Sequence, residues 1–210
     1  MRQWGLADHA AAMGLNLSPL AVEQLNSLLQ LLAKWNRVYN LTSLREEAKW
    51  VSHHLLDSLS IVGILPPGRL IDVGSGGGFP GLPIAVANPG RDIVLLDSNN
   101  KKTAFLRQAV AELGLNNVSV ETQRVESFNP PGGFDVVVSR AFSDLPTFIK
   151  LAGHLCASQG TLVAMKGVFP ADELANVTAA TVEKVVRLEV PMFDEERHAV
   201  FLHPLALRKG

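Results

Sequence analysis

After residue 68 the sequence alternates short apolar segments with helical ones, and this alternation restricts the fold more than any other feature. Apolar segments predict strands at 69–73, 92–96, 118–122, 134–139 and 161–165. Between them, helices are predicted from about residue 80, over about 101–113, and over about 144–155. Short apolar strands that alternate with helices are typical of a parallel sheet covered on both faces.

The C-terminal part of the chain departs from this alternation. Segments 182–190 and 198–204 are rich in β-forming residues, with no helical pattern between them. They predict an antiparallel hairpin that closes one edge of the sheet. The predicted fold is therefore α/β, with a mostly parallel, seven-stranded sheet and helices on both faces.

The first 65 residues have a helical pattern, and Pro66-Pro67-Gly68 separates them from the rest. Ser18 and Pro19 are suited to cap and begin a helix, which is expected to run to about Val38. Its apolar stripe has three- and four-residue spacing and consists of Leu25, Leu28, Leu29, Leu32 and Trp35. A second helical stretch is expected over 46–64. We therefore expect a helical N-terminal extension, 1–65, packed on a domain formed by 66–210.

Composition excludes several classes of protein. Hydrophobic residues make up 47% of the chain and charged residues 19%, which is typical of a globular domain. No apolar run is long enough to span a membrane, and the N-terminus lacks the apolar core of a secretory signal. The single cysteine, Cys156, is interpreted as a buried apolar residue, and its being alone fits a reducing cytoplasm. The net charge of −1 argues neither for nor against a nucleic-acid partner, so any such role must depend on a local cluster of cations.

A glycine-rich loop follows the first predicted strand, with the sequence Asp-Val-Gly-Ser-Gly-Gly-Gly at 72–78. Gly76-x-Gly78-x-x-Gly81 also matches the dinucleotide fingerprint, which is weak evidence alone. A carboxylate at Asp72 would repel a pyrophosphate and attract an ammonium group, such as that of S-adenosylmethionine. Asp97 ends the second strand, where a carboxylate can bind ribose hydroxyls in both cofactor classes.

Basic residues follow the later strands. Arg124, Arg140 and Lys166 come at or directly after the ends of the third, fourth and fifth strands. Together they suit an anionic substrate, or the carboxylate of the cofactor. Metal chemistry is not expected, because His53 and His54 are adjacent and would point apart on a helix. The loop also lacks the Gly-Lys-Ser/Thr of an NTPase and the spacing of a serine nucleophile elbow.

Six spaced motifs carry a specific resemblance. They are Trp-Asn-x-x-x-Asn-Leu-Thr at 35–42, His-x-Leu-Asp-Ser at 54–58, Asp-Val-Gly-Ser-Gly-Gly-Gly-Phe-Pro-Gly at 72–81, Arg-Val-Glu at 124–126, Ser-Arg-Ala at 139–141 and Met-Lys-Gly at 165–167. Over about residues 20–204 the chain resembles the bacterial ribosomal RNA small-subunit methyltransferase G family, also called glucose-inhibited division protein B. The resemblance implies a class I, Rossmann-like methyltransferase that transfers a methyl group from S-adenosyl-L-methionine to N7 of a guanine in 16S ribosomal RNA.

The resemblance also implies which residues form the site. For the cofactor it implies Gly74, Phe79, Val125, Glu126 and Arg140, to which the loop reasoning adds Asp72, Gly76, Gly78 and Asp97. Arg140 is then assigned to the cofactor rather than to RNA. The substrate-side candidates are Asn40, His54, Arg124, Lys166 and Arg197. Tyr39 and Phe142 are candidates to stack on the target base, whereas Trp35 is expected to lie in the core.

Two alternatives remain open from the sequence. One is a methyltransferase for a small anionic metabolite, with the helical extension as a lid, which would suit the neutral net charge. The other is a ribosome-assembly factor that binds RNA and retains a methyltransferase fold without activity, although Asp97 and the intact loop argue against it. The expected partner is 16S ribosomal RNA within the small subunit or a precursor, acted on by a cytoplasmic monomer without metal or membrane attachment.

Overall fold

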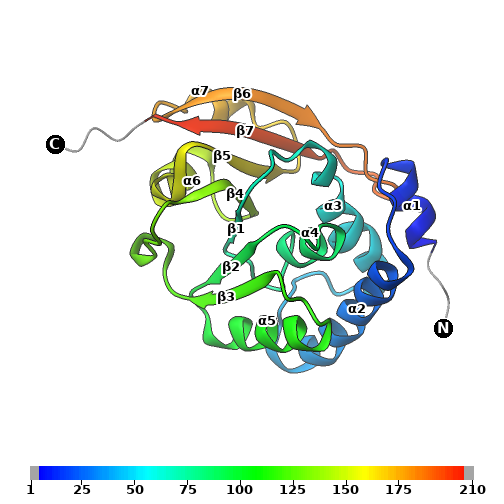
Figure 1. Ribbon diagram of the computed structural model, residues 1–210. Coiled ribbons are helices and arrows are strands. Elements are labelled where there is room, and N and C mark those ends of the chain that lie inside the picture. The colour runs from blue at the N-terminus through cyan, green and yellow to red at the C-terminus, as the bar shows by residue number, and fades with distance from the viewer. Residues whose placement is uncertain (1–4, 206–210) are drawn as a thin grey trace.

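The alternating segments form one seven-stranded sheet in the computed structural model, which describes residues 5–205 (Figure 1). The strand order is β3-β2-β1-β4-β5-β7-β6. The strands are β1 (Leu70–Val73), β2 (Ile93–Asp97), β3 (Val118–Thr122), β4 (Phe134–Arg140), β5 (Cys156–Lys166), β6 (Ala180–Arg187) and β7 (His198–Pro204). The first five are parallel, and β7 pairs antiparallel with both β5 and β6. The predicted mostly parallel sheet with a C-terminal hairpin at one edge is confirmed.

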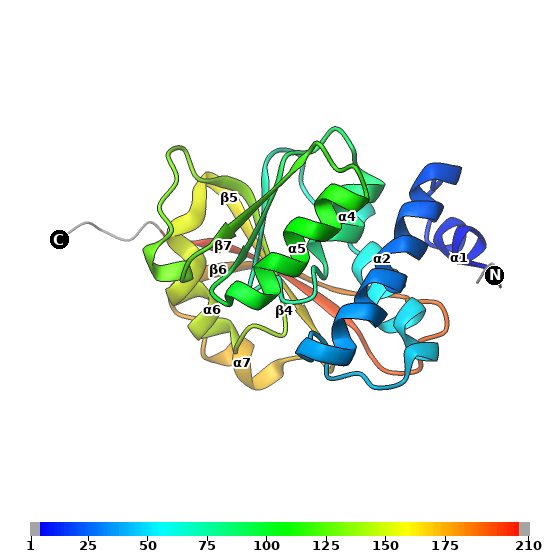
Figure 2. The same cartoon turned by 90° about the horizontal axis from the view of Figure 1, so that it is seen from below.

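Helices cover both faces of this sheet, as Figures 1 and 2 show. They are α1 (Leu6–Ala12), α2 (Pro19–Tyr39), α3 (Asp57–Leu59), α4 (Gly81–Ala87), α5 (Asn100–Glu112), α6 (Leu145–Ala152) and α7 (Ala171–Ala175). Alternate residues of a strand serve opposite faces. Leu70 therefore belongs to the apolar core shared with α2, α4 and α5, whereas Ile71 belongs to the core shared with α6. Of these helices, α7 had no sequence prediction.

The helix expected after Ser18 is present as α2. The Ser18 side chain accepts a hydrogen bond from the backbone N–H of Ala21 at 3.1 Å and so caps the helix. Leu25, Leu28 and Leu32 are fully buried. They belong to the same core cluster as β1 and β2. That 1–65 forms an extension distinct from 66–210 stays a prediction.

The helical stretch expected over 46–64 is not one regular helix. It consists of a 3-10 turn at Glu47–Lys49, a π-helix at Val51–Leu56, α3, and a 3-10 turn at Val62–Ile64. Within this irregular segment the Ser58 hydroxyl donates a hydrogen bond to the backbone carbonyl of His54, four residues earlier, at 2.5 Å. The wider π-turn sets the direction in which the neighbouring polar side chains point. Among residues 5–205, no helix is long and apolar enough to cross a membrane.

The order in which strands are added to the sheet reverses between β1 and β4, which are themselves parallel. From β1 the chain proceeds outward to β2 and β3, and it then returns to place β4 on the other side of β1. The loops that follow β1 and β4 therefore diverge at the carboxyl edge of the sheet. Ligands of doubly wound sheets bind at such a switch point.

Candidate cofactor and substrate site

The glycine loop folds back over the carboxyl ends of β1 and β2. The backbone N–H groups of Gly74 and Ser75 donate to the carbonyl of Leu96 at 2.8 and 3.1 Å. Gly74 has a φ of 72°, in the left-handed region that favours glycine. A Cβ atom at Gly74 would lie 2.8 Å from the ring of Phe142. A glycine is therefore required there both by the turn and by the neighbouring side chain.

Asp72 lies beneath this loop, not on the ligand edge where the sequence analysis placed it. Its side chain points to the face of the sheet covered by α4, opposite to its neighbours Ile71 and Val73. The Asp72 Oδ2 atom accepts a hydrogen bond from the backbone N–H of Gly81 at 2.9 Å, at the start of α4. The carboxyl is fully buried, and within the described chain its Oδ1 atom has no hydrogen-bond partner. Burial raises the pKa of Asp72 to about 7. Its placement indicates that it holds the loop against α4, so the predicted direct attraction of an ammonium group is corrected.

Asp97 occupies the expected position at the end of β2. One carboxylate oxygen accepts from the backbone N–H of Gly76, and the other from that of Asn99, both at 2.9 Å. These bonds hold the carboxylate at the rim of the loop, where it lines a cavity.

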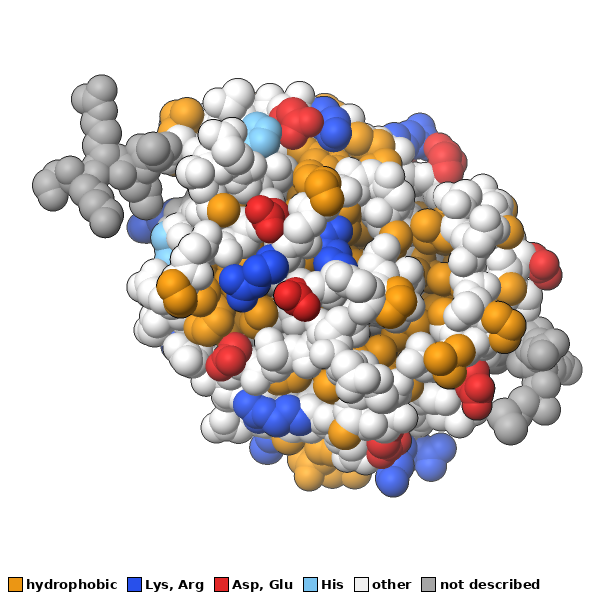
Figure 3. All heavy atoms as spheres, viewed as in Figure 1, with side chains coloured by type: hydrophobic (Ala, Val, Ile, Leu, Met, Phe, Trp, Pro, Cys, Tyr) orange, Lys and Arg blue, Asp and Glu red, His pale blue; other side chains and the backbone are white. Residues whose placement is uncertain are grey.

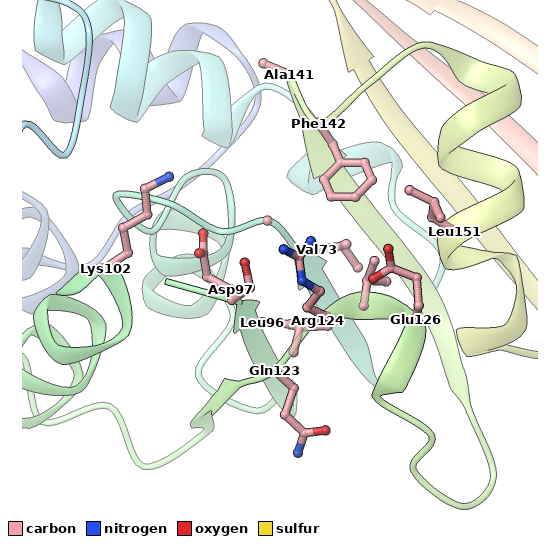
Figure 4. A pocket seen from close by; sticks show the side chains of 13 residues that line it. Val73, Leu96, Asp97, Lys102, Gln123, Arg124, Glu126, Ala141, Phe142 and Leu151 are labelled. Atoms are coloured by element: carbon pink, nitrogen blue, oxygen red, sulfur yellow. The ribbon is translucent and has the colours of Figure 1, made fainter. Parts of the chain in front are cut away.

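An open cavity of about 360 Å³ lies at the carboxyl ends of β1 to β4 (Figure 4). Its volume is in the range of small-molecule sites. Apolar walls and four charged side chains share the lining, which consists of Val73, Gly74, Leu96, Asp97, Ser98, Lys102, Gln123, Arg124, Val125, Glu126, Ala141, Phe142 and Leu151. In Figure 4, Asp97 and Glu126 lie on opposite sides of Arg124. Such a lining suits a ligand with a flat apolar part, hydroxyls and a positive charge.

The cavity brings together only part of the predicted cofactor set. Gly74, Asp97, Val125 and Glu126 line it, together with Arg124, which was assigned to the substrate. The remaining predicted cofactor residues, Asp72, Gly76, Gly78, Phe79 and Arg140, do not line it. Lys102 lines it without having been predicted.

A second group of polar side chains surrounds Asp57, whose side chain is 1% exposed. Arg197 donates to both carboxylate oxygens, from Nε at 2.7 Å and from Nη2 at 2.9 Å. Arg140 donates from Nη1 to the same carboxylate at 2.9 Å and to the carbonyl of His53 at 2.7 Å. This ion triad joins the end of β4 and the segment before β7 to the helical segment 51–59. Asp57 was absent from the predicted site residues, although it stands in the His-x-Leu-Asp-Ser motif.

His54 is buried beside this triad. Its ring stacks on Phe79 with the centroids 4.6 Å apart, and its Nε2 atom lies 3.0 Å from the Thr42 hydroxyl. Burial, and then the nearby Arg140 guanidinium, lower the pKa of His54 to about 3. The imidazole is therefore neutral at physiological pH and contributes no positive charge to the site.

Two of the three strand-end cations are already paired. Arg140 pairs with Asp57, and the Lys166 ammonium lies 2.7 Å from the Glu173 carboxylate of α7. Lys166 also donates to the carbonyl of Ser143 at 2.7 Å. Each of these two cations therefore has a carboxylate partner that was not predicted, and their roles toward a ligand stay predictions. Arg124 is exposed and forms no ion pair within the described chain.

The remaining candidates lie near the end of α2. Asn40 is exposed, has a φ of 48°, and accepts a hydrogen bond from Arg45 at 3.1 Å. Tyr39 is 43% exposed. Trp35 packs edge-on against Phe105 of α5 with a centroid distance of 5.8 Å, as expected of a core residue.

Metal binding and cysteine reactivity are the two remaining side-chain chemistries. Residues 5–205 contain no group of three or more His, Cys, Asp or Glu side chains that could hold a metal ion. Burial raises the pKa of the Cys156 thiol to about 12, so the nucleophilic thiolate is scarce at neutral pH.

Comparison with known proteins adds to this geometry. A family model described as GidB, rRNA small subunit methyltransferase G, matches residues 21–200. Two proteins named ribosomal RNA small subunit methyltransferase G are close relatives. The one from Chromobacterium violaceum is 53% identical and covers 93% of this chain and 94% of its own. The one from Neisseria meningitidis serogroup C is 51% identical, with coverage of 91% and 93%.

Solved structures share the fold. A SAM-dependent methyltransferase from Aquifex aeolicus superposes with a TM-score of 0.56 at 16% identity, over 78% of this chain and 96% of that one. The chain therefore shares the Rossmann-like fold of this methyltransferase.

Proposed function

Since the chain belongs to the rRNA small subunit methyltransferase G family, we propose that it transfers a methyl group from S-adenosylmethionine to N7 of a guanine in 16S ribosomal RNA. The chain is a methyltransferase of small-subunit ribosomal RNA by this membership. The proposed partner is the small subunit or a precursor, acted on in the cytoplasm by a monomer.

The cavity at the switch point carries the proposal for the cofactor. Asp97 is held by two backbone N–H groups and would accept hydrogen bonds from ribose hydroxyls. Val125 and Phe142 provide apolar surface for a flat base, and Gly74 leaves its backbone bare beside them. Glu126 adds a negative charge that suits a cationic ligand. S-adenosylmethionine, when bound, supplies an electrophilic methyl group on a sulfonium.

Guanine N7 requires little of the protein beyond placement. It offers an uncharged lone pair, so no proton has to be removed before attack and no tuned general base is needed. His54, with its pKa lowered to about 3, would be only a weak base, which agrees with this. The rate enhancement would come from holding N7 close to the methyl group and in line with it. In a folded RNA the target base must first be unstacked.

Arg197 is the proposed substrate-side group held in advance by Asp57, and Arg140, held by the same carboxylate, is proposed to contact the cofactor. The Arg140 and Arg197 side chains are 17% and 15% exposed, so each guanidinium is ordered while remaining accessible. Arg124 and Lys166 are proposed to act nearby, and Asn40 at the end of α2.

The test uses labelled S-adenosylmethionine and small ribosomal subunits from a strain that lacks this gene. After incubation, the RNA is digested and the labelled nucleoside is identified. Labelled 7-methylguanosine at one position of 16S RNA is expected. Absence of label in RNA would refute the proposal and leave the metabolite methyltransferase and the inactive assembly factor as the alternatives.

A matched pair of variants tests the cavity. Asp97 is the last residue of β2, and Asp92 directly precedes its first residue. Asp92 therefore lies at the opposite end of the strand, where it is exposed. Asp97→Asn is expected to weaken cofactor binding at least tenfold in calorimetry, because the side chain loses its charge and one of its two acceptor oxygens. Asp92→Asn is expected to bind as the wild type does. Equal affinities of both variants would remove the cavity from the proposed cofactor site.

A further inference from the structure

Two segments of the chain each combine three Lys or Arg residues with the absence of any acidic residue. Residues 24–45 and 98–111 together hold six of the 19 Lys and Arg residues and none of the 20 Asp and Glu residues. The rest of the chain has 13 basic and 20 acidic residues, a net charge of −7. The overall charge of −1 therefore conceals a strong separation of charge along the sequence.

The fold brings these two segments together, because they form most of α2 and α5. Trp35 of α2 packs on Phe105 and donates from Nε1 to Gln108 of α5 at 3.1 Å. At the end nearest the site, the Lys101 ammonium lies 5.9 Å from the centroid of the Tyr39 ring. Figure 2 shows the C-terminal end of α2 and the N-terminal end of α5 at the same, lower edge of the view.

We define the α2–α5 surface by the six cations of these segments: Lys34, Arg37, Arg45, Lys101, Lys102 and Arg107. Lys102 is half-buried, and the other five are exposed. In the described part of the chain none of the six forms an ion pair. Glu46, the first acidic residue beyond Arg45, is already paired with Lys49 at 3.0 Å. The six cations thus have no ion-pair partner within the described chain, and the glutamates of the two helices, Glu23 and Glu112, lie toward the helix ends far from Tyr39 and Lys101.

This arrangement differs from that of other parts of the surface. In the upper part of Figure 3, above the level at which Figure 1 shows α2 and α5, Lys and Arg side chains lie next to Asp and Glu side chains. Interspersed charges of both signs are typical of a solvated surface, whereas cations gathered on adjoining helices produce a local positive potential.

The surface is continuous with the proposed cofactor cavity. Lys102 belongs to the α2–α5 surface and also lines the cavity, where Arg124 joins it. The Lys101 ammonium lies over the Tyr39 ring, and this cation–π interaction attracts Lys101 to the surface without a carboxylate partner. A polyanion that follows these cations would arrive at the site of methyl transfer.

We propose that the α2–α5 surface binds the sugar–phosphate backbone of the RNA that flanks the target guanine. This rests on the proposed function for the identity of the polyanion. Each phosphate that a cation neutralises releases counterions, so the affinity falls with salt with a slope of about 0.7–0.9 per contact. The sequence-independent part of RNA affinity is therefore assigned to α2 and α5, which adjoin the cofactor cavity at Lys102.

The experiment measures binding of unmethylated 16S RNA, transcribed in vitro, at several KCl concentrations. Arg37→Gln and Lys101→Gln are each expected to weaken binding severalfold at low salt and to lower the slope of log affinity against log salt by about 1. Tyr39→Leu, which removes the ring beneath Lys101, is expected to act in the same direction with a smaller effect. For Arg37→Gln and Lys101→Gln, the affinity for S-adenosylmethionine, measured without RNA, and the melting temperature should stay at the wild-type values.

Arg187→Gln is the matched control, because it removes one exposed cation from β6, at the sheet edge opposite β3. It should leave the salt slope unchanged. Wild-type slopes for Arg37→Gln and Lys101→Gln would overturn the proposal. So would variants that bind RNA normally but lose activity on small subunits, since the surface would then contact a protein. If the wild type methylates no RNA while the slopes fall as expected, the proposed function fails and the RNA surface stands.

Discussion

Asp57→Asn tests the ion triad most directly. The wild-type carboxylate is 1% exposed and accepts three hydrogen bonds from two guanidinium groups, at 2.7 to 2.9 Å. The variant leaves Arg140 and Arg197, which are 17% and 15% exposed, adjacent to each other without a counter-ion. Removing one partner of a buried pair costs about 3–5 kcal/mol. Because both guanidiniums retain some contact with water, we expect the lower end, about 3 kcal/mol.

The loss is a large share of the 5–15 kcal/mol by which a domain is typically stable. At this chain length, 1 kcal/mol shifts the melting temperature by about 2–4 °C, so a decrease of roughly 6–12 °C is expected. Urea unfolding followed by circular dichroism measures the free energy of unfolding directly. The exposed Asp194 is the control, because Asp194→Asn should change that free energy by less than about 0.5 kcal/mol.

A double-mutant cycle with Arg197→Met separates the ion pair from other effects of the substitution. Once Arg197 is absent, Asp57→Asn removes only the contact with Arg140, so its effect should fall by at least about 1 kcal/mol. A coupling energy below about 0.5 kcal/mol, or a loss of stability no larger than that of Asp194→Asn, would refute the view that the triad holds these segments together.

Three further predictions follow from the site. Because burial raises the pKa of Asp72 to about 7, the folded state retains a proton that the unfolded state releases near pH 4, so this carboxyl should lower stability as the pH rises from about 4 to 7. Asp72→Asn should flatten that decline in urea unfolding measured across this range, and an unchanged pH profile would contradict the burial argument. With a pKa of about 12, Cys156 should react with a thiol reagent at pH 8 at least 100-fold more slowly in the folded protein than in urea; equal rates would show an accessible thiolate. Gly74→Ala should weaken S-adenosylmethionine binding about tenfold or more in calorimetry, because its Cβ would displace the Phe142 ring at 2.8 Å, whereas unchanged affinity would show that the ring moves freely.

The central strands β1, β2 and β4 were predictable because they are buried along nearly their whole length and are short apolar runs. The sequence locates them to within one residue at either end, and it locates the more exposed β3 to the residue. The start of β5 was missed by five residues, since its first part, at 156–160, is polar or small and only partly buried. The short helix α7 lacks an apolar repeat long enough to detect.

The cavity residues were predictable from the same rule, because parallel strands end at one edge of the sheet. Asp97, Val125 and Glu126 reach the cavity for this reason. The direction of Asp72 was also available from the sequence. It stands between Ile71 and Val73, which face one core, so its own side chain must face the other.

The partners of the charged residues could not be predicted, because they are distant in sequence. Asp57 meets Arg140 across 83 residues and Arg197 across 140. The apolar spacing over 46–64 is the same whether the segment forms an α-helix or a π-helix, so periodicity alone does not reveal where Asp57 points. The direction of the Asp57 side chain becomes clear only from the positions of Arg140 and Arg197 in the folded protein.

Net charge did not indicate a nucleic-acid partner, because it does not record which charges are paired in the folded protein. A sum over the chain treats a cation paired with a buried carboxylate, such as Arg140, as equal to an unpaired surface cation such as Lys101. In the folded protein the strand-end bases that looked available are largely neutralised, while the unpaired cations lie on α2 and α5. Under the two proposals, Arg197, held by Asp57, would position the reacting base, and the unpaired cations would retain the flanking phosphates. Dividing these tasks between two regions allows RNA affinity to change without disturbing the cofactor cavity, which is the distinction that the salt slopes of Arg37→Gln and Lys101→Gln measure.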